Sequence, residues 1–277
     1  MDKKLNFVFL GTPDVASETL EILKAAGYIP SLIITSPDKP QERKMLVTPP
    51  PVKVWAQENN VSYIQPEKLS PEEFKEDFDL SIVVAYGKII PEKILKMPKL
   101  GSINIHYSLL PKYRGASPVE SAILNGDTET GVTIQKMEFE MDAGAIIAQE
   151  KITILPDEKA PDLRKRLIKI GAELLVKILT PSASSASPYI GGGWVGVKQD
   201  GKEATFCKKI KKEDGLIDLN DDPVKNYNKF RAYATWPRTY FFRDGKRIII
   251  TKARLENNQF IIEKVIPEGG KEIDYKK

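Results

Sequence analysis

The sequence contains one cysteine, Cys207, and one histidine, His106, in 277 residues. A lone cysteine excludes an internal disulfide, so we expect a reducing, cytoplasmic environment. One histidine and one cysteine leave no clustered ligands of the kind that hold zinc, and we predict no metal site. Long apolar runs are also lacking: none approaches the roughly 18 to 20 residues that cross a bilayer, and no signal peptide precedes the first strand. We expect no membrane contact.

Charge is nearly balanced, with 42 Lys and Arg against 38 Asp and Glu. The small excess lies at the carboxyl end: residues 204–277 carry 17 basic and 11 acidic side chains, whereas the first 203 carry 25 and 27. A basic domain of this kind is typical of proteins that contact phosphate groups, and equally of tails that keep a protein soluble. Both interpretations stay open.

Apolar runs alternate with amphipathic segments in the first 180 residues. The periodicity predicts a helix over 13–26, with Thr12 as its N-cap and Pro13 as its first residue, and helices after Pro49, after Pro91 and over 161–179. Strands separated by helices indicate an α/β fold with a doubly wound, mostly parallel, Rossmann-like sheet, which binds ligands at the carboxyl ends of its strands. The predicted strands are 6–10, 31–35, 80–86, 102–106 and 132–137.

The pattern breaks after residue 180. Residues 181–203 are rich in Ser, Pro and Gly, which is typical of a linker, so we predict domains over 1–180 and 204–277. In the second we expect a helix over 223–234 and a hairpin turn at 243–246. A small OB-like β-barrel is the simplest arrangement for its predicted strands, which are 205–210, 239–242, 246–251 and 260–265.

Asn104 and His106 stand two apart in a predicted strand, so their side chains point to one face at its carboxyl end. Transfer of an acyl group to an amine needs a donor aimed at the carbonyl oxygen and a group that moves a proton. An amide supplies the hydrogen-bond donor, and an imidazole can either donate to the oxygen or move the proton. A lone histidine is more often structural, but the neighbouring Asn104 and the Pro- and Gly-containing loop that follows favour a catalytic role.

Asp142 follows the predicted strand 132–137, in the segment Glu140-Met-Asp-Ala-Gly144. A carboxylate there can orient the imidazole and stabilise its charged form. An Asp before Gly is also common in turns, and spacing alone does not show that Asp142 and His106 meet.

These residues belong to a longer pattern that resembles the folate-dependent formyltransferase superfamily. The resemblance covers roughly residues 5 to 255 and rests on motifs in the family's order: Phe9-Leu-Gly-Thr-Pro-Asp14, Pro37-Asp-Lys-Pro40, Pro50-Pro-Val-Lys53, Val83-Val-Ala-Tyr-Gly87, Asn104-x-His106-x-Ser108-Leu-Leu-Pro111 with Arg114-Gly115, Gly131-Val-Thr133, Asp142-x-Gly144 and Trp236-Pro237.

The resemblance implies an enzyme that moves a formyl group from 10-formyltetrahydrofolate to the amino group of initiator methionyl-tRNA. It implies that Asn104 and His106 stabilise the developing oxyanion, while Asp142 keeps His106 charged and relays a proton through water. It also implies a set of folate-binding positions: Val84, Ala85, Tyr86, Gly87, Ser108, Leu109, Leu110, Pro111, Glu138 and Asp142.

For the tRNA, the resemblance implies contacts from the loop 37–53 and from Arg114. Basic side chains there and in the second domain are candidates for phosphate contacts: Lys39, Arg43, Lys44, Lys208, Lys209, Lys211 and Lys212. Three features depart from the family: the loop lacks its usual Gly-Arg-Gly-like centre, Val15 stands where a larger aromatic is common, and the second domain is short. We expect a monomer.

Other functions stay open. A formyltransferase for an amino-sugar nucleotide or glycinamide ribonucleotide would share much of the segment 106–115, and a decayed tRNA-binding module would have lost part of the trio, which is intact. A nicotinamide dehydrogenase is set aside, because Pro13 stands in the first turn where G-x-G-x-x-G requires glycine.

Overall fold

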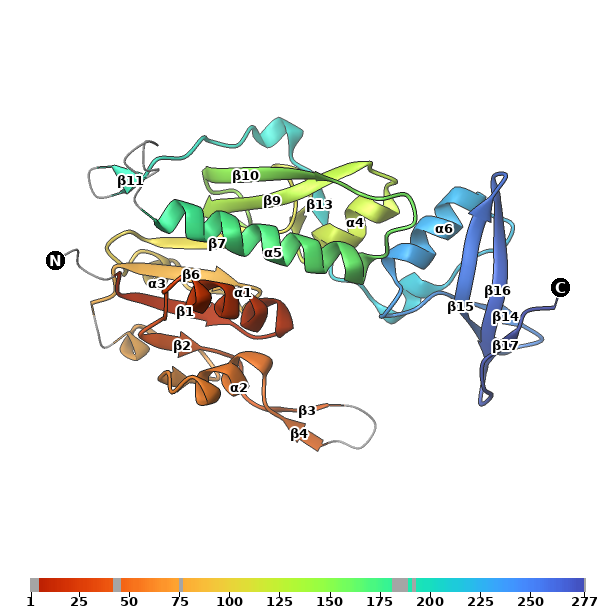
Figure 1. Cartoon of the computed structure of the whole chain (residues 1–277), viewed down its shortest axis with the longest axis horizontal. Coiled ribbons are helices and arrows are strands. Elements are labelled where there is room, and N and C mark those ends of the chain that lie inside the picture. Colours follow the sequence, from red (N-terminus) through yellow and green to blue (C-terminus); the bar gives the residue numbers. More distant parts are fainter. Residues whose placement is uncertain (1–4, 42–45, 75–76, 181–188, 191–192, 277) are drawn as a thin grey trace. The chain divides into compact units, whose positions relative to one another are not determined.

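The structure is a computed structural model that describes residues 5–41, 46–74, 77–180, 189–190 and 193–276 (Figure 1). The chain divides into two compact units, each assembled from separate stretches. The first, called the sheet unit here, comprises Met1–Pro111, Val132–Glu150 and Leu167–Ala204. The second, called the C-terminal unit, comprises Lys112–Gly131, Lys151–Arg166 and Thr205–Lys277. Each unit is described by itself.

A seven-stranded sheet has the order β10-β9-β7-β6-β1-β2-β5. Neighbours from β5 to β7 run parallel, whereas β9 runs antiparallel to β7, so the predicted mostly parallel α/β sheet is confirmed. A separate two-stranded hairpin, β3 (Lys39–Gln41) with β4 (Leu46–Thr48), lies outside this sheet. The sheet strands are β1 (Phe7–Gly11), β2 (Leu32–Ile34), β5 (Tyr63–Ile64), β6 (Leu80–Val84), β7 (Ser102–His106), β9 (Glu129–Lys136) and β10 (Ile146–Thr153).

Helices connect these strands where the sequence predicts them. They are α1 (Asp14–Ala25), α2 (Pro51–Glu58), α3 (Glu92–Leu95) and α5 (Ala160–Leu179), with a 3₁₀ turn at Pro71–Glu73. The helix predicted after Pro91 is only one turn long. The predicted linker contains the short strands β11 (Tyr189–Ile190) and β12 (Gly193–Trp194), which pair with each other; residues 181–188 lie outside the described part of the chain.

The predicted N-cap of α1 is wrong. The helix begins at Asp14 with Pro13 as its N-cap, and no side chain caps it. Thr12 is engaged elsewhere: its Oγ1 donates to the main-chain oxygen of Tyr86 at 3.1 Å and lies 3.1 Å from Oγ of Ser36. Because the Thr12 hydroxyl has one hydrogen, Ser36 donates to Thr12. One side chain therefore joins the segments that follow β1, β2 and β6.

The central strands are buried on both faces, as expected for a doubly wound sheet. Helices α1 and α5 lie in front of the sheet in Figure 1. At Gly171 of α5, a Cβ would lie 3.0 Å from Cγ2 of Ile105 and 3.1 Å from Cγ1 of Val132. The helix backbone therefore packs directly on the apolar face of β7 and β9, which leaves their polar residues on the opposite face.

The C-terminal unit holds a four-stranded antiparallel sheet, β14-β15-β16-β17, on which α6 packs. The predicted hairpin turn is confirmed: Arg243 pairs with Lys246, and Asp244 and Gly245 both have positive φ, which is the geometry of a type I′ turn. The predicted strand over 205–210 shrinks to β13 (Phe206–Cys207), which pairs with β8 (Arg114–Gly115) rather than with this sheet. The other elements are α4 (Pro118–Leu124), α6 (Pro223–Ala232), β14 (Tyr240–Arg243), β15 (Lys246–Glu256), β16 (Gln259–Pro267) and β17 (Ile273–Asp274).

The two units have separate apolar cores. One cluster in the sheet unit forms under the segments that follow β5 and β6, and it includes Val8, Leu10 and Val83. The cluster in the C-terminal unit includes Tyr227 and Phe230 of α6 against Ile250 of β15. No helix among the described residues has the length and apolar character to span a membrane.

Candidate active site

Asn104 and His106 lie on one face of β7, as predicted. The antiparallel register pairs Asn104 with Gln135 and His106 with Thr133 of β9. Directly paired residues point to the same face, so two more polar side chains join the first two. The alternate residues Ile103, Ile105 and Ile134 point to the other face. An otherwise apolar part of the sheet thus carries four polar side chains side by side.

Asp142 reaches this polar face from the loop after β9. Its Oδ2 lies 3.7 Å from Nδ1 of His106, and both side chains are largely buried. This separation is an ion-pair distance rather than a hydrogen bond, and catalytic contacts commonly tighten when substrate binds. The structure therefore brings the three predicted catalytic residues Asn104, His106 and Asp142 together.

The backbone that carries Asp142 is unusual. Asp142 has φ +50°, a left-handed conformation that costs energy for a residue with a side chain. At Gly144, a Cβ would lie only 1.7 Å from the main-chain oxygen of Lys136. The loop therefore presses against the end of β9, and its backbone geometry requires glycine at position 144.

Thr133 organises the loop after β7. Its buried hydroxyl donates to the main-chain oxygen of Ser108 at 2.7 Å, and it accepts from the N–H of Leu110 at 3.1 Å. Gln149 of β10 donates to the Thr133 hydroxyl at 2.8 Å and to the oxygen of Leu110, also at 2.8 Å. The segment beginning at Ser108 is thus bound to the neighbouring strands by side chains.

The predicted folate-binding positions lie in three segments. Val83 is level with Asn104 in the parallel register, so the chain leaves β6 beside the end of β7. There Ala85 and Gly87 are exposed and have positive φ, whereas the ring of Tyr86 is buried in the apolar core. Burial raises the pKa of the Tyr86 hydroxyl. Main-chain groups, rather than this ring, are available to a ligand.

The second and third folate-binding segments differ in exposure. In the loop after β7, Ser108 and Leu110 are buried, while Leu109 and Pro111 are half-buried. Glu138, after β9, is exposed. It lines a pocket of about 700 Å³ with Phe139, Glu140 and the start of β7, at the opposite end of that strand from His106.

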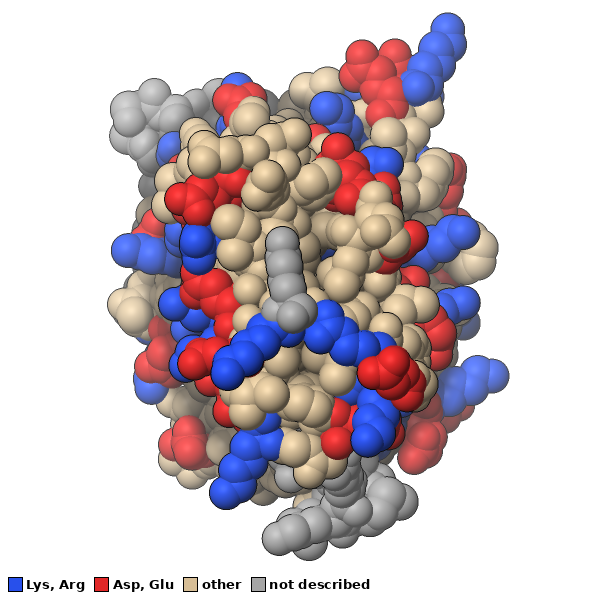
Figure 2. Space-filling view, turned by 90° about the vertical axis from the view of Figure 1, so that its right-hand side faces the viewer, with Lys and Arg blue, Asp and Glu red and all other residues tan. Residues whose placement is uncertain are grey.

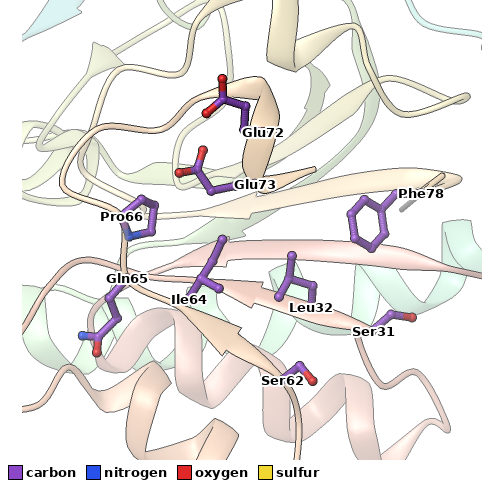
Figure 3. A pocket seen from close by; sticks show the side chains of 9 residues that line it. All are labelled: Ser31, Leu32, Ser62, Ile64, Gln65, Pro66, Glu72, Glu73 and Phe78. Carbon is purple, nitrogen blue, oxygen red and sulfur yellow. The ribbon is translucent and has the colours of Figure 1, made fainter. Parts of the chain in front are cut away.

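A second pocket, of about 530 Å³, lies near strands β2 and β5 (Figure 3). Leu32, Ile64 and Phe78 supply its apolar lining, and Glu72 and Glu73 add carboxylates. None of the nine residues that line it belongs to the predicted site. The main-chain N–H and hydroxyl of Ser70 donate to Glu73, and these bonds hold the pKa of that carboxyl below its usual range.

Two motifs from the predicted tRNA-contacting loop meet in the structure. Lys53 pairs with Asp38 at 2.6 Å, and Gln65 donates to the same carboxylate at 2.7 Å. The hydrogen bond from Gln65, followed by that from Lys53, lowers the pKa of Asp38. Lys39 lies next to this pair and is exposed; Arg43 and Lys44 lie outside the described residues.

The predicted basic residues of the C-terminal unit divide into two kinds. Arg114 is buried, with 5% of its surface exposed. The ammonium groups of Lys208, Lys209, Lys211 and Lys212 are exposed, and none forms an ion pair with a described residue. By contrast, Lys252 and Arg254 are paired with Glu263. Figure 2 shows Lys and Arg scattered among Asp and Glu over the face it presents.

Sequence reasoning missed Thr133, Gln135, Gln149 and Gln199 as residues of the site. The available signal was a pair of polar residues, Thr133 and Gln135, alternating with apolar ones in a strand otherwise suited to a core. Gln199, in the predicted linker, is buried and donates to the main-chain oxygens of Asp142 and Gly144. Among the described residues no cluster of His, Cys, Asp and Glu suits a metal ion.

Solved structures share the fold. A methionyl-tRNA formyltransferase from Clostridium thermocellum aligns with a TM-score of 0.63 at 18% identity, covering 98% of this chain and 100% of that one. A sugar 3N-formyl transferase, WlaRD, described with dTDP and 5-N-formyl-THF, aligns with a TM-score of 0.68 at 20% identity, covering 92% and 88%. Both are too distant in sequence to indicate more than the fold.

Sequence relatives are closer. The methionyl-tRNA formyltransferase of Thermotoga maritima is 43% identical over 239 residues, which are 84% of this chain and 74% of the relative. That of Caldicellulosiruptor saccharolyticus is 40% identical over 263 residues, or 91% and 82%. Residues 3–179 match the formyl transferase family and residues 209–276 match the formyl transferase C-terminal domain. Because both family models match and relatives about 40% identical cover most of the chain, the chain belongs to the formyl transferase family.

Proposed function

We propose that this protein transfers the formyl group of 10-formyltetrahydrofolate to the amino group of initiator methionyl-tRNA, for the start of translation. The observation that carries the proposal is the approach of Asp142 to His106 on the face that also presents Asn104. The choice of acceptor is supported by relatives about 40% identical over most of the chain that are named for this reaction.

The three side chains suit the steps of formyl transfer. The acceptor amine attacks the formyl carbon, a new C–N bond forms, and the carbonyl oxygen gains negative charge. Asn104 and the imidazole of His106 are the donors for that oxygen. The carboxylate of Asp142 stabilises the imidazole in its charged form and receives the amine proton through water. The bond to N10 of the folate then breaks, N10 takes up a proton, and the carbonyl re-forms.

The residues near the trio also fit a folate. The exposed main chain at Ala85 and Gly87 offers hydrogen-bonding groups to the edge of a ring. Exposed apolar side chains stand beside two of the candidate segments: Ile89, two residues after Gly87, is 87% exposed, and Met141, next to Asp142, is 65% exposed. Exposed apolar groups near polar ones are typical of sites that a flat, partly polar ligand covers.

We further propose that residues 1–180 form the catalytic domain, that 181–203 link the domains, and that 204–277 form an OB-like domain that binds tRNA. Lys208, Lys209, Lys211 and Lys212 support the last role, because they are exposed and none of them forms an ion pair with a described carboxylate. Arg114 and Lys39, with Arg43 and Lys44, complete the proposed tRNA contacts. The protein is proposed to act as a monomer in the cytoplasm.

The decisive assay offers 10-formyltetrahydrofolate with three acceptors in separate reactions: methionyl-tRNA, glycinamide ribonucleotide and an amino-sugar nucleotide. We expect formylation of methionyl-tRNA, with kcat/KM at least a hundredfold above that for the other two. Preference for either small nucleotide would replace the proposed acceptor while leaving the chemistry in place. Absence of formyl transfer to all three, with tRNA still bound, would indicate a decayed binding module.

A further inference from the structure

Gln135 has no role in the steps above, yet it lies at the centre of the polar face. It is directly opposite Asn104 in the β7–β9 register, and only 2% of its surface is exposed. A buried amide that lacks partners costs about 1 to 3 kcal/mol, so its hydrogen bonds indicate what it is for. Its Nε2 donates to Oδ1 of Asp142 at 2.8 Å.

This bond fixes the plane of the Asp142 carboxylate. The terminal torsion of an aspartate is broad and nearly two-fold, so an unrestrained carboxylate samples many orientations. In this protein one oxygen, Oδ1, is held by Gln135, and the other, Oδ2, faces Nδ1 of His106. With Oδ1 held, rotation of the group would move Oδ2 away from the imidazole.

The backbone of Asp142 is held by a second glutamine. Nε2 of Gln199 donates to the main-chain oxygen of Asp142 at 2.8 Å and to that of Gly144 at 2.7 Å. The same Nε2 lies 3.5 Å from Oε1 of Gln135, so the two glutamine amides also contact each other. The two bonds to main-chain oxygens bind the loop at the residue with positive φ, so Gln199 holds the backbone while Gln135 holds the side chain.

We infer that Gln135 is a positioning residue for formyl transfer, which acts by aiming the Asp142 carboxylate at His106. The inference rests on the proposed function of Asn104, His106 and Asp142. Gln135 need not touch either substrate to act in this way. Its loss should therefore slow the chemical step, because a displacement of about 1 Å in a catalytic group can lower the rate roughly a hundredfold.

The test replaces Gln135 with Met, which keeps the length and volume of the side chain but cannot donate. We expect kcat to fall roughly 10- to 100-fold, with KM for both substrates changed less than twofold. The matched control is Gln57→Met, which also removes a hydrogen bond donated by a glutamine amide, that to the hydroxyl of Tyr63 at 3.1 Å. Tyr63 lies in β5, five strands from β9 and so about 24 Å away. The control should keep the parent kcat.

A double-mutant cycle with Asp142→Asn separates positioning from a general structural effect. If Gln135 acts through Asp142, Gln135→Met should change kcat less than twofold in the Asp142→Asn background. The imidazole offers an independent readout, because His106 is the only histidine and a protein labelled with ¹⁵N-histidine has a single side-chain pair of signals. Gln135→Met should shift those signals and Gln57→Met should not.

The possible failures are distinguishable. If His106→Ala and Asp142→Asn keep the parent kcat, the proposed function of the trio fails. If those two variants are slow but folded Gln135→Met keeps the parent kcat, or slows Asp142→Asn by the same factor as the parent, only the positioning inference is overturned. Should Gln135→Met not fold, Gln135→Leu, which also cannot donate to Asp142, decides by the same criteria.

Discussion

Oδ2 of Asp142 and Nδ1 of His106 lie 3.7 Å apart, although one residue ends a strand and the other lies in a loop of left-handed backbone. Nothing local in the sequence brings them together. The approach depends on the antiparallel pairing of β7 with β9 and on the return of the following loop over the polar face. The candidate active site is therefore formed by one pair of strands and one loop.

Removal of either donor on this face should slow the reaction. His106→Ala and Asn104→Ala are each expected to lower kcat about a hundredfold or more, the usual size of general acid–base and oxyanion contributions. Single-turnover measurements with saturating methionyl-tRNA give the rate, and thermal unfolding checks that each variant folds. A folded variant with a near-parental rate would remove that residue from the mechanism.

The loop that carries Asp142 should not tolerate a side chain at Gly144. In Gly144→Ala the new methyl group would meet the main-chain oxygen of Lys136, so the loop must move. We expect a stability loss of about 1 to 3 kcal/mol in denaturant unfolding, together with lower kcat. Gly201→Ala is the matched control, because nothing lies within 4 Å of a Cβ there. Equal stability of the two variants would contradict the close approach.

The exposed lysines between residues 208 and 212 should contribute to tRNA affinity through phosphate charge. Changing Lys208, Lys209, Lys211 and Lys212 to Gln is expected to weaken tRNA binding and to flatten its dependence on salt, by roughly 0.7 to 0.9 in slope for each phosphate that the protein no longer neutralises. Folate affinity should not change. Filter binding at several salt concentrations measures the slope.

A control for that experiment neutralises exposed lysines in a helix. Lys165, Lys169 and Lys177 of α5 are exposed and have no proposed role. Replacing them with Gln should change the salt slope less, for each charge removed, than replacing the four lysines between residues 208 and 212. An equal effect per charge from both sets would favour the interpretation that the basic excess serves solubility.

The Asp38 carboxylate should make stability depend on pH. The bonds from Gln65 and Lys53 lower its pKa in the folded protein. A lowered folded pKa contributes stability that is present above the unfolded value, about 3.9, and is lost as pH falls through the folded value. The difference in unfolding free energy between the parent and Asp38→Asn should therefore be largest near pH 7 and shrink below about pH 4. A constant difference across this range would show that the charge is not responsible.

Strands with strong apolar character could be predicted from the sequence. The predicted strand over 102–106 has the observed bounds, and the predicted helix over 161–179 differs from α5 by one residue. β10 was not predicted, because this terminal strand of the sheet is largely exposed and carries Glu150 and Lys151 in its middle. Its composition resembles that of a polar loop, and only pairing with β9 makes it a strand.

The candidate site could likewise be predicted from the sequence only in part. Asn104, His106 and Asp142 could be named from residue type and motif, and the structure brings them together. Gln135 and Gln199 could not, since their importance depends on burial and on hydrogen bonds to residues distant in the chain. The role of the folate and tRNA positions and the boundaries at 180 and 204 stay predictions.

The hydroxyl of Thr12 connects segments that are far apart in the chain. It is hydrogen-bonded to Ser36 after β2 and to the main-chain oxygen of Tyr86 after β6. Thr12 itself follows β1, so this hydroxyl joins the turns that follow three adjacent strands of the sheet. The turn at residues 85–87 is therefore joined by hydrogen bonds, through Thr12, to the segment that leads into the β3–β4 hairpin. One short polar side chain thus connects a proposed folate-binding segment with the chain that enters the proposed tRNA-contacting loop.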